Sequence, residues 1–127
     1  MDYVDDESIE QATELWRRVT RDQIIHDQNL GVWRPTSAAF SDSSDGTPMS
    51  VDIASIIRSR GGDERTAIAQ YPGLFLVSLT AEQVRAKQLG VCRSPQPDNP
   101  AHAYVFGDKT KSIRKYLAKS ARWVVAP

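Results

Sequence analysis

The spacing of hydrophobic residues changes several times along the chain, and each change marks a short element. Residues 74–79 (LFLVSL) and 102–106 (HAYVF) are apolar runs of strand length, bounded by turn residues. Residues 91–93 and 123–125 are shorter runs of the same kind. Residues 33–35 must be extended, because proline lacks an amide hydrogen and disfavours helix at the residue before it. Residues 38–40 are expected to form a further short strand.

Hydroxyl residues stand where helix N-caps are expected. Two of them are followed three residues later by glutamine, which completes a capping box. We therefore expect a short helix through residues 24–25, one over 51–57, one after residue 80 and one reaching about residue 120. Residues 63–70 add one or two helical turns. The four N-cap residues are Thr20, Ser50, Thr80 and Thr110.

Residues 6–19 allow two interpretations. Apolar residues at helical spacing and acidic residues near the start favour a helix. Residues 15–19 (LWRRV) fit a strand as well, and the sequence leaves this choice open.

Strand, helix and strand follow one another twice, over residues 74–93 and 102–125. The intervening helices are short for parallel crossovers, which favours an α+β fold. We expect one domain over residues 1–127, with a small mixed sheet and short helices packed mainly on one face. Residues 1–8 are expected to be a mobile acidic extension.

Composition narrows the class of protein. The 127 residues are 40% hydrophobic and 25% charged, which is typical of a globular domain. The formal net charge is zero, so bulk charge indicates no particular partner. The single cysteine, Cys92, excludes an internal disulfide and favours a reducing, cytoplasmic location. The longest strongly apolar run is six residues and the N-terminus is acidic, so we expect neither a membrane span nor a signal peptide.

Several segments together resemble a group of small, uncharacterised bacterial proteins of about this length. The segments are RRV, RPTSAAF, MSVD, LTAEQVRAKQLGV and NPAHAYVFGDKTKS. The resemblance covers residues 15–127. It implies no activity, so no functional residue is carried over from it.

The segment GDKTKS, residues 107–112, is a candidate anion site. It lies between a predicted strand and a predicted helix N-terminus, where free amide groups favour an anion. Lysines in a first helical turn oppose the helix dipole, and a bound phosphate would remove that conflict. The same helix should present a basic stripe that could meet nucleic acid or an acidic partner; a solvated helix face is the alternative. The candidate residues for a phosphate or an acidic partner are Lys109, Thr110, Lys111, Arg114 and Lys115.

A second set of candidates concerns catalysis. Arginines and hydroxyl residues in the order RRV and then RPTSAAF resemble those of nucleotide-using transferases, in which an arginine clamps a pyrophosphate. The set comprises Arg17, Arg18, Arg34, Thr36, Ser37, Asp52 and Arg85. His102 is a candidate proton carrier, and with Cys92 on a neighbouring strand it could form a thiol–imidazole pair. The simpler interpretation is a structural cysteine and a hydrogen-bonded histidine. From these, the catalytic candidates are Arg18, Arg34, Ser37 and His102.

No metal site and no cofactor is expected. His26, His102 and Cys92 are far apart in the sequence, whereas structural zinc usually needs four such ligands. The tryptophans Trp16, Trp33 and Trp123 are core or interface anchors, and the sequence does not say which.

These observations favour a small cytosolic accessory or binding module that acts through a protein or a phosphate-bearing partner. The alternative is a small transferase or nuclease-like effector that uses a nucleotide or nucleic acid. That alternative requires Arg18, Arg34, Ser37, His102 and Lys109 to converge on one cleft. The sequence does not indicate an oligomeric state.

Overall fold

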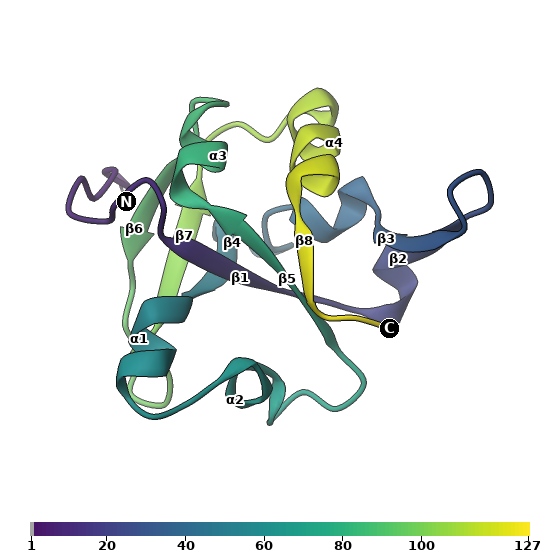
Figure 1. Ribbon diagram of the computed structural model, residues 1–127. Helices are drawn as coiled ribbons and strands as arrows, with labels where there is room; N and C mark the ends of the chain where they lie inside the picture. The colour runs from purple at the N-terminus through teal and green to yellow at the C-terminus, as the bar shows by residue number, and fades with distance from the viewer. Residues whose placement is uncertain (1) are drawn as a thin grey trace.

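A six-stranded antiparallel sheet organises the chain in the computed structural model, which describes residues 2–127 (Figure 1). Met1, the first residue of the expected extension 1–8, lies outside the described residues. The strand order is β6-β7-β4-β1-β5-β8, and every neighbouring pair is antiparallel. The strands are β1 (Glu14–Val19), β4 (Met49–Ile53), β5 (Phe75–Thr80), β6 (Gly90–Arg93), β7 (His102–Phe106) and β8 (Arg122–Val125).

Helices flank both faces of the sheet. On one face lie α3 (Ala81–Arg85) and α4 (Lys111–Ser120), and on the other lie α1 (Ala54–Ser59) and α2 (Glu64–Ile68) (Figure 1). The larger hydrophobic cluster lies between the sheet and α3 and α4. A smaller cluster lies under α1 and α2 and contains Trp16, Ala54, Ile57, Ala67, Leu76 and Ala101.

The α+β class, with one small sheet and short helices, is confirmed. The structure adds two details to the expectation. All strand pairs are antiparallel, because helices of five to ten residues do not form the long crossovers that parallel neighbours need. In addition, α1 and α2 cover part of the face that was expected to carry few helices.

Residues 15–19 form a strand, which settles the choice that the sequence left open. Strand β1 lies between β4 and β5, and it carries fully buried apolar side chains on both of its faces. Leu15 and Val19 point into the larger cluster, while Trp16 points into the smaller one. Apolar residues on both faces of a central strand remove the alternation that would have identified it.

Three local expectations are corrected. The helix expected over 51–57 is strand β4 followed by α1, because Val51 and Ile53 alternate with Ser50 and Asp52 across a central strand. The helix expected at 24–25 is a single 3-10 turn, Arg21–Gln23, followed by a strand. The strand expected at 38–40 is the 3-10 helix Ser37–Phe40.

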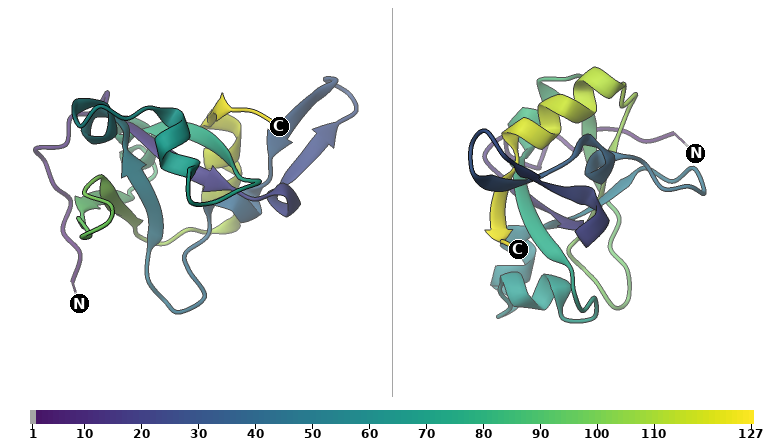
Figure 2. Two further views of the ribbon diagram at one scale, coloured as in Figure 1. Left: turned by 90° about the horizontal axis from the view of Figure 1, so that it is seen from below. Right: turned by 90° about the vertical axis from the view of Figure 1, so that its right-hand side faces the viewer.

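A separate hairpin projects from the body of the protein, as Figure 2 shows. Its strands are β2 (Ile24–Asp27) and β3 (Val32–Pro35). Trp123 anchors it, because its Nε1 donates a hydrogen bond to the Trp33 carbonyl at 3.0 Å. Of the six exposed large hydrophobic side chains in residues 2–127, four lie in this hairpin: Ile25, Leu30, Val32 and Trp33.

The three tryptophans therefore differ in environment. Trp16 is fully buried, Trp33 is 49% exposed, and Trp123 is partly buried with its ring edge-on to Phe75. Among residues 2–127, no helix has both the length and the apolar character needed to cross a membrane.

Candidate functional site

A cavity of about 760 Å³ opens between the sheet and the elements α1 and α2. We call it the sheet cavity. Strands β1, β4 and β7 form its floor, and residues 60–71 and 96–102 contribute to its walls. Its polar lining includes Arg18, Ser50, Asp52, Tyr71, Asn99 and His102.

Strand alternation explains why these side chains share one face. On β4, Val51 and Ile53 enter the larger core, so Ser50 and Asp52 must point to the opposite side. Asp52 pairs with His102 in the register of β4 and β7, which brings both side chains to the cavity floor. The polar floor is therefore a direct consequence of the sheet register.

Arg18 is held in one position by three contacts. Its Nη2 lies 2.6 Å from Oδ2 of Asp52, and its Nε donates to the carbonyl of Ala67 at 2.7 Å. Ala67 lies in the last turn of α2, where carbonyl groups lack helical partners and attract cations. The Tyr71 ring lies 4.5 Å from the guanidinium carbon. Within residues 2–127, Nη1 of Arg18 donates to no protein atom, so one edge of the guanidinium remains available.

Asp52 is a buried carboxylate with both oxygens satisfied. It is 1% exposed, and its Oδ1 accepts a hydrogen bond from Nδ2 of Asn99 at 2.8 Å. Its Oδ2 is the partner of Arg18. A buried charge needs such pairing, so Asp52 fixes Arg18 and Asn99 at the cavity wall.

His102 is buried, at 6% exposure, with both ring nitrogens in hydrogen-bond contact. Nδ1 lies 2.9 Å from the carbonyl oxygen of Ser94, and Nε2 lies 3.1 Å from Oγ of Ser50. A carbonyl only accepts, so Nδ1 carries the hydrogen. In the tautomer with the hydrogen on Nδ1, Nε2 is the acceptor and the Ser50 hydroxyl is the donor.

The candidate pair of Cys92 and His102 is not formed. The imidazole of His102 is committed to Ser94 and Ser50, while Cys92 pairs with Tyr104 in the strand register. Burial raises the pKa of the Cys92 thiol, and the nearby acidic residues raise it further. These effects disfavour the thiolate, which is the nucleophilic form.

The other catalytic candidates lie outside the sheet cavity. Arg34 is on the projecting hairpin, where its Nε lies 3.2 Å from Oδ2 of Asp27. Ser37 begins the 3-10 helix Ser37–Phe40. Of the residues required to converge for a transferase or nuclease-like site, only Arg18 and His102 line the cavity.

Arg17 points away from the sheet cavity and into the opposite layer. Its guanidinium donates to the carbonyls of Ala39 and Ser50, both at 2.9 Å. Burial lowers the pKa of Arg17 to about 10. These contacts tie β1 to the chain around residues 39–50, so Arg17 has a structural role.

Three of the candidate residues at the N-terminus of α4 contact other protein groups. Nζ of Lys109, whose side chain is 4% exposed, lies 2.6 Å from Oδ1 of Asp42, so this ammonium group already has a carboxylate partner. Thr110 caps the helix by accepting from the amide of Ile113 at 3.3 Å. Arg114 turns toward Ser41, with Nη1 at 3.4 Å from its Oγ.

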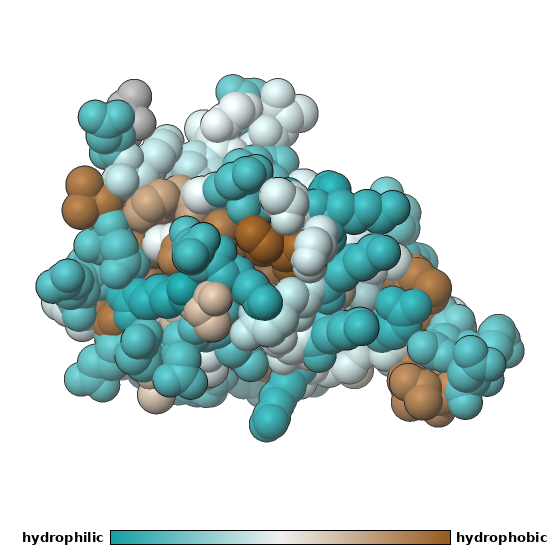
Figure 3. Space-filling model, turned by 90° about the horizontal axis from the view of Figure 1, so that it is seen from above, coloured by the Kyte–Doolittle hydropathy of each residue, from teal (hydrophilic) through white to brown (hydrophobic). Residues whose placement is uncertain are grey.

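The lysine stripe of α4 is exposed. It comprises Lys111, Lys115 and Lys119. Lys87 lies close to the same helix, with its Nζ 4.5 Å from the centre of the Tyr116 ring. Figure 3 shows the molecule from the side of α3 and α4, where the surface is mostly hydrophilic. A phosphate or an acidic partner at this stripe remains a prediction.

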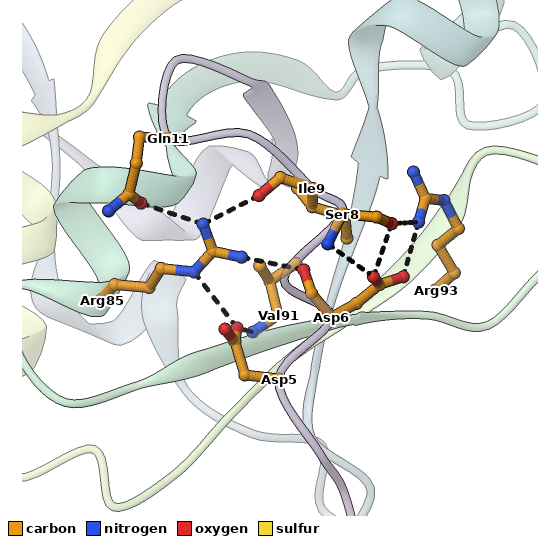
Figure 4. Close-up of polar contacts among 8 residues, drawn as sticks. All are labelled: Asp5, Asp6, Ser8, Ile9, Gln11, Arg85, Val91 and Arg93. Atoms are coloured by element: carbon orange, nitrogen blue, oxygen red, sulfur yellow. Dashed lines mark hydrogen bonds and ion pairs between the residues drawn. The ribbon is translucent and has the colours of Figure 1, made fainter.

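The acidic N-terminal segment contacts arginines of other elements. Asp5 and Asp6 bond to the backbone of Val91 at the outer edge of β6 (Figure 4). The Asp6 amide donates to the Val91 carbonyl at 2.8 Å, and the Val91 amide donates to Oδ1 of Asp5 at 2.9 Å. Arg85 and Arg93 hold these carboxylates at 3.2 Å and 2.5 Å. The segment thus covers a sheet edge, and Arg85 of the arginine and hydroxyl set has a structural partner.

Among residues 2–127, no group of three or more histidine, cysteine, aspartate or glutamate residues is arranged to hold a metal ion. Comparison of the chain with family models, curated proteins and solved structures gave no match. The resemblance to a bacterial group remains a prediction.

Sequence reasoning missed most of the residues that line the sheet cavity. Ser50 was interpreted as a helix cap, and Asn99, Tyr71 and Arg60 were given no role. The signal that could have found Ser50 is the alternation over residues 49–53, with polar residues at 50 and 52 between apolar neighbours.

Proposed function

We propose that this protein is a binding module whose sheet cavity takes a small ligand carrying one phosphate or carboxylate group. The observation that supports this most is the fixed guanidinium of Arg18, which lines a preformed cavity and whose Nη1 has no partner among residues 2–127. An arginine held in place loses little freedom on binding an anion, and its planar edge matches phosphate and carboxylate oxygens. The cavity volume of about 760 Å³ lies in the range typical of small-molecule sites.

The charges around the cavity favour a ligand of low charge. The lining contains two arginines, Arg18 and Arg60, and two aspartates, Asp52 and Asp98, so its formal charges balance. A polyanion such as nucleic acid would meet no excess of positive charge here. The uncharged hydrogen-bonding side chains of the wall suit a ligand with polar groups beyond its anionic end.

The proposal includes a reducing, cytoplasmic setting. It is supported by the single cysteine, which is partly buried and forms no disulfide.

Binding can be tested by titrating the isotope-labelled protein with inorganic phosphate, glutarate and adenosine monophosphate. We expect saturable shifts of the backbone amide resonances of Gly62 and Ala101, which line the cavity, and none at Gly31 in the hairpin. Arg18→Lys should weaken binding, because lysine lacks the planar edge. Arg34→Lys is the matched control, since Arg34 also pairs with an aspartate but lies outside the cavity.

Arg60→Gln offers a second variant that leaves the fold intact, because Arg60 is exposed and lies in the cavity wall. It should weaken binding without changing thermal stability. The proposal is refuted if all three probes leave the Gly62 and Ala101 resonances unshifted, or if Arg34→Lys weakens binding as much as Arg18→Lys does.

A further inference from the structure

We infer that Ser50 is a nucleophile activated by His102, and that the sheet cavity hydrolyses small carboxylic esters. The inference deepens the proposed function and rests on it, because it places the ester in the same cavity. It depends on a hydrogen bond between two cavity-lining side chains from neighbouring strands.

The first step is the geometry of the base. Nε2 of His102 lies 3.1 Å from Oγ of Ser50, which is within the reach required for proton transfer. Nδ1 donates to the carbonyl of Ser94 at 2.9 Å, and this bond holds the ring in the tautomer whose Nε2 can accept a proton. Hydrogen bonds therefore connect a nucleophile, the Ser50 hydroxyl, to a base, the His102 ring, and connect that base to the Ser94 carbonyl that orients it.

The second step is the position of the nucleophile. Ser50 is partly exposed and lines the cavity, so a substrate can reach its hydroxyl group. Ser78 offers a comparison on the same sheet. It is also partly exposed, but its Oγ donates to Oε2 of Glu14 at 3.2 Å, and in the described part of the chain it contacts no histidine. Only Ser50 of these two strand serines has an activating base.

The third step is stabilisation of negative charge on the substrate. Arg18 and Ser50 both line the sheet cavity. Nη2 of Arg18 lies 2.6 Å from Oδ2 of Asp52, which is two residues from Ser50 on the same face of β4. In this proposal the free Nη1 of Arg18 donates to the oxyanion that forms next to Ser50.

The reaction follows from these positions. The Ser50 oxygen attacks the carbonyl carbon of the ester as its proton moves to Nε2 of His102, and the carbonyl oxygen becomes an oxyanion beside Arg18. The bond from the carbonyl carbon to the alkoxy oxygen then breaks, and His102 returns the proton to the departing alcohol. Water attacks the acyl-enzyme in the same way, with His102 taking its proton, and releases the carboxylic acid and free Ser50.

A fluorophosphonate probe tests the nucleophile directly. The Ser50 oxygen bonds to phosphorus, fluoride leaves, and His102 takes the hydroxyl proton. We expect one probe mass per folded protein, mapped to Ser50 by peptide mass spectrometry, and slow hydrolysis of 4-nitrophenyl acetate by the same protein. Ser50→Ala should abolish both, while Ser78→Ala should leave both unchanged. His102→Gln should slow labelling by about 100-fold or more.

Because His102 is buried, the glutamine variant can lose its fold, so the decisive reading is on the wild-type chain. The inference is overturned if the folded wild-type protein is labelled no faster at Ser50 than at Ser78. Phosphate titration of Ser50→Ala separates this failure from failure of the proposed function. Binding by that variant, with no labelling of the wild type, rejects the esterase and retains the binding module. Labelling at Ser50 without any binding of the anionic probes supports the nucleophile and rejects the anion site.

Discussion

Replacing Arg18 by methionine should destabilise the protein by about 3–5 kcal/mol, because it leaves a carboxylate buried without its charged partner. Asp52 is 1% exposed and its Oδ2 lies 2.6 Å from Nη2 of Arg18, so the substitution removes the one ion pair that Asp52 forms within residues 2–127. Asn99 remains as a partner at 2.8 Å, but a neutral amide compensates the charge only in part. The Ala67 carbonyl also loses its donor, and an unsatisfied buried acceptor costs about 1–3 kcal/mol.

Urea unfolding followed by circular dichroism measures this loss. The midpoint should fall while the slope stays constant, which identifies a change in stability rather than in compactness. Arg34→Met is the control, because Arg34 and Asp27 form a more exposed pair, and such pairs contribute about 0–1 kcal/mol. The double variant Arg18→Met with Asp52→Leu should recover most of the loss, since it removes the orphaned charge as well. If Arg18→Met costs no more than Arg34→Met, or if the double variant recovers nothing, the account of a buried charge pair is incorrect.

Three further predictions concern other parts of the molecule. Gly90→Ala should lower the melting temperature, because the added Cβ would lie 2.3 Å from the Phe106 ring and such overpacking costs about 1–3 kcal/mol; an unchanged melting temperature would contradict the observed approach. Ser8→Ala should raise the pKa of Asp6, which carbon NMR can follow, because the hydrogen bond from the Ser8 hydroxyl is the main cause that lowers this pKa below 3.8. The ionised Asp6 carboxylate stabilises the folded state above pH 3.8, and this contribution is lost as the pH falls through the folded-state pKa. Cys92 should be alkylated at pH 8 more slowly in the native protein than in urea, because burial raises its pKa, and equal rates would show that it is accessible.

The elements that local signals predicted correctly are those with one buried face or a complete cap. The helix α4 follows from Thr110 and the helical spacing of its apolar residues. The capping box at Thr80 forms as expected, with the Thr80 amide donating to Gln83 Oε1 at 2.9 Å and the Gln83 amide donating to Thr80 Oγ1 at 3.1 Å. Such signals lie within four residues of one another, so the sequence alone contains them.

Strands β1 and β4 were harder to predict because their environment is set by distant segments. Each lies inside the sheet, and each carries polar residues on the face that becomes the cavity floor. Arg18 and His102 were named from residue type, but their convergence depends on the order of β7, β4 and β1, which no local pattern reveals. The role of Ser50 was missed for the same reason, since a serine before apolar residues also fits a helix cap.

The two faces of the sheet differ in a way that folding alone does not explain. The face under α3 and α4 is a continuous apolar core, as a small domain requires. On the other face, α1 and α2 have six and five residues and leave a cavity over Ser50, Asp52 and His102. Replacing a buried ion pair by apolar residues is often neutral or stabilising, so stability gives no reason for a charge pair at this place. Local departures from an apolar core are expected at functional sites, and here the departure coincides with a cavity, a fixed arginine and a serine bonded to histidine.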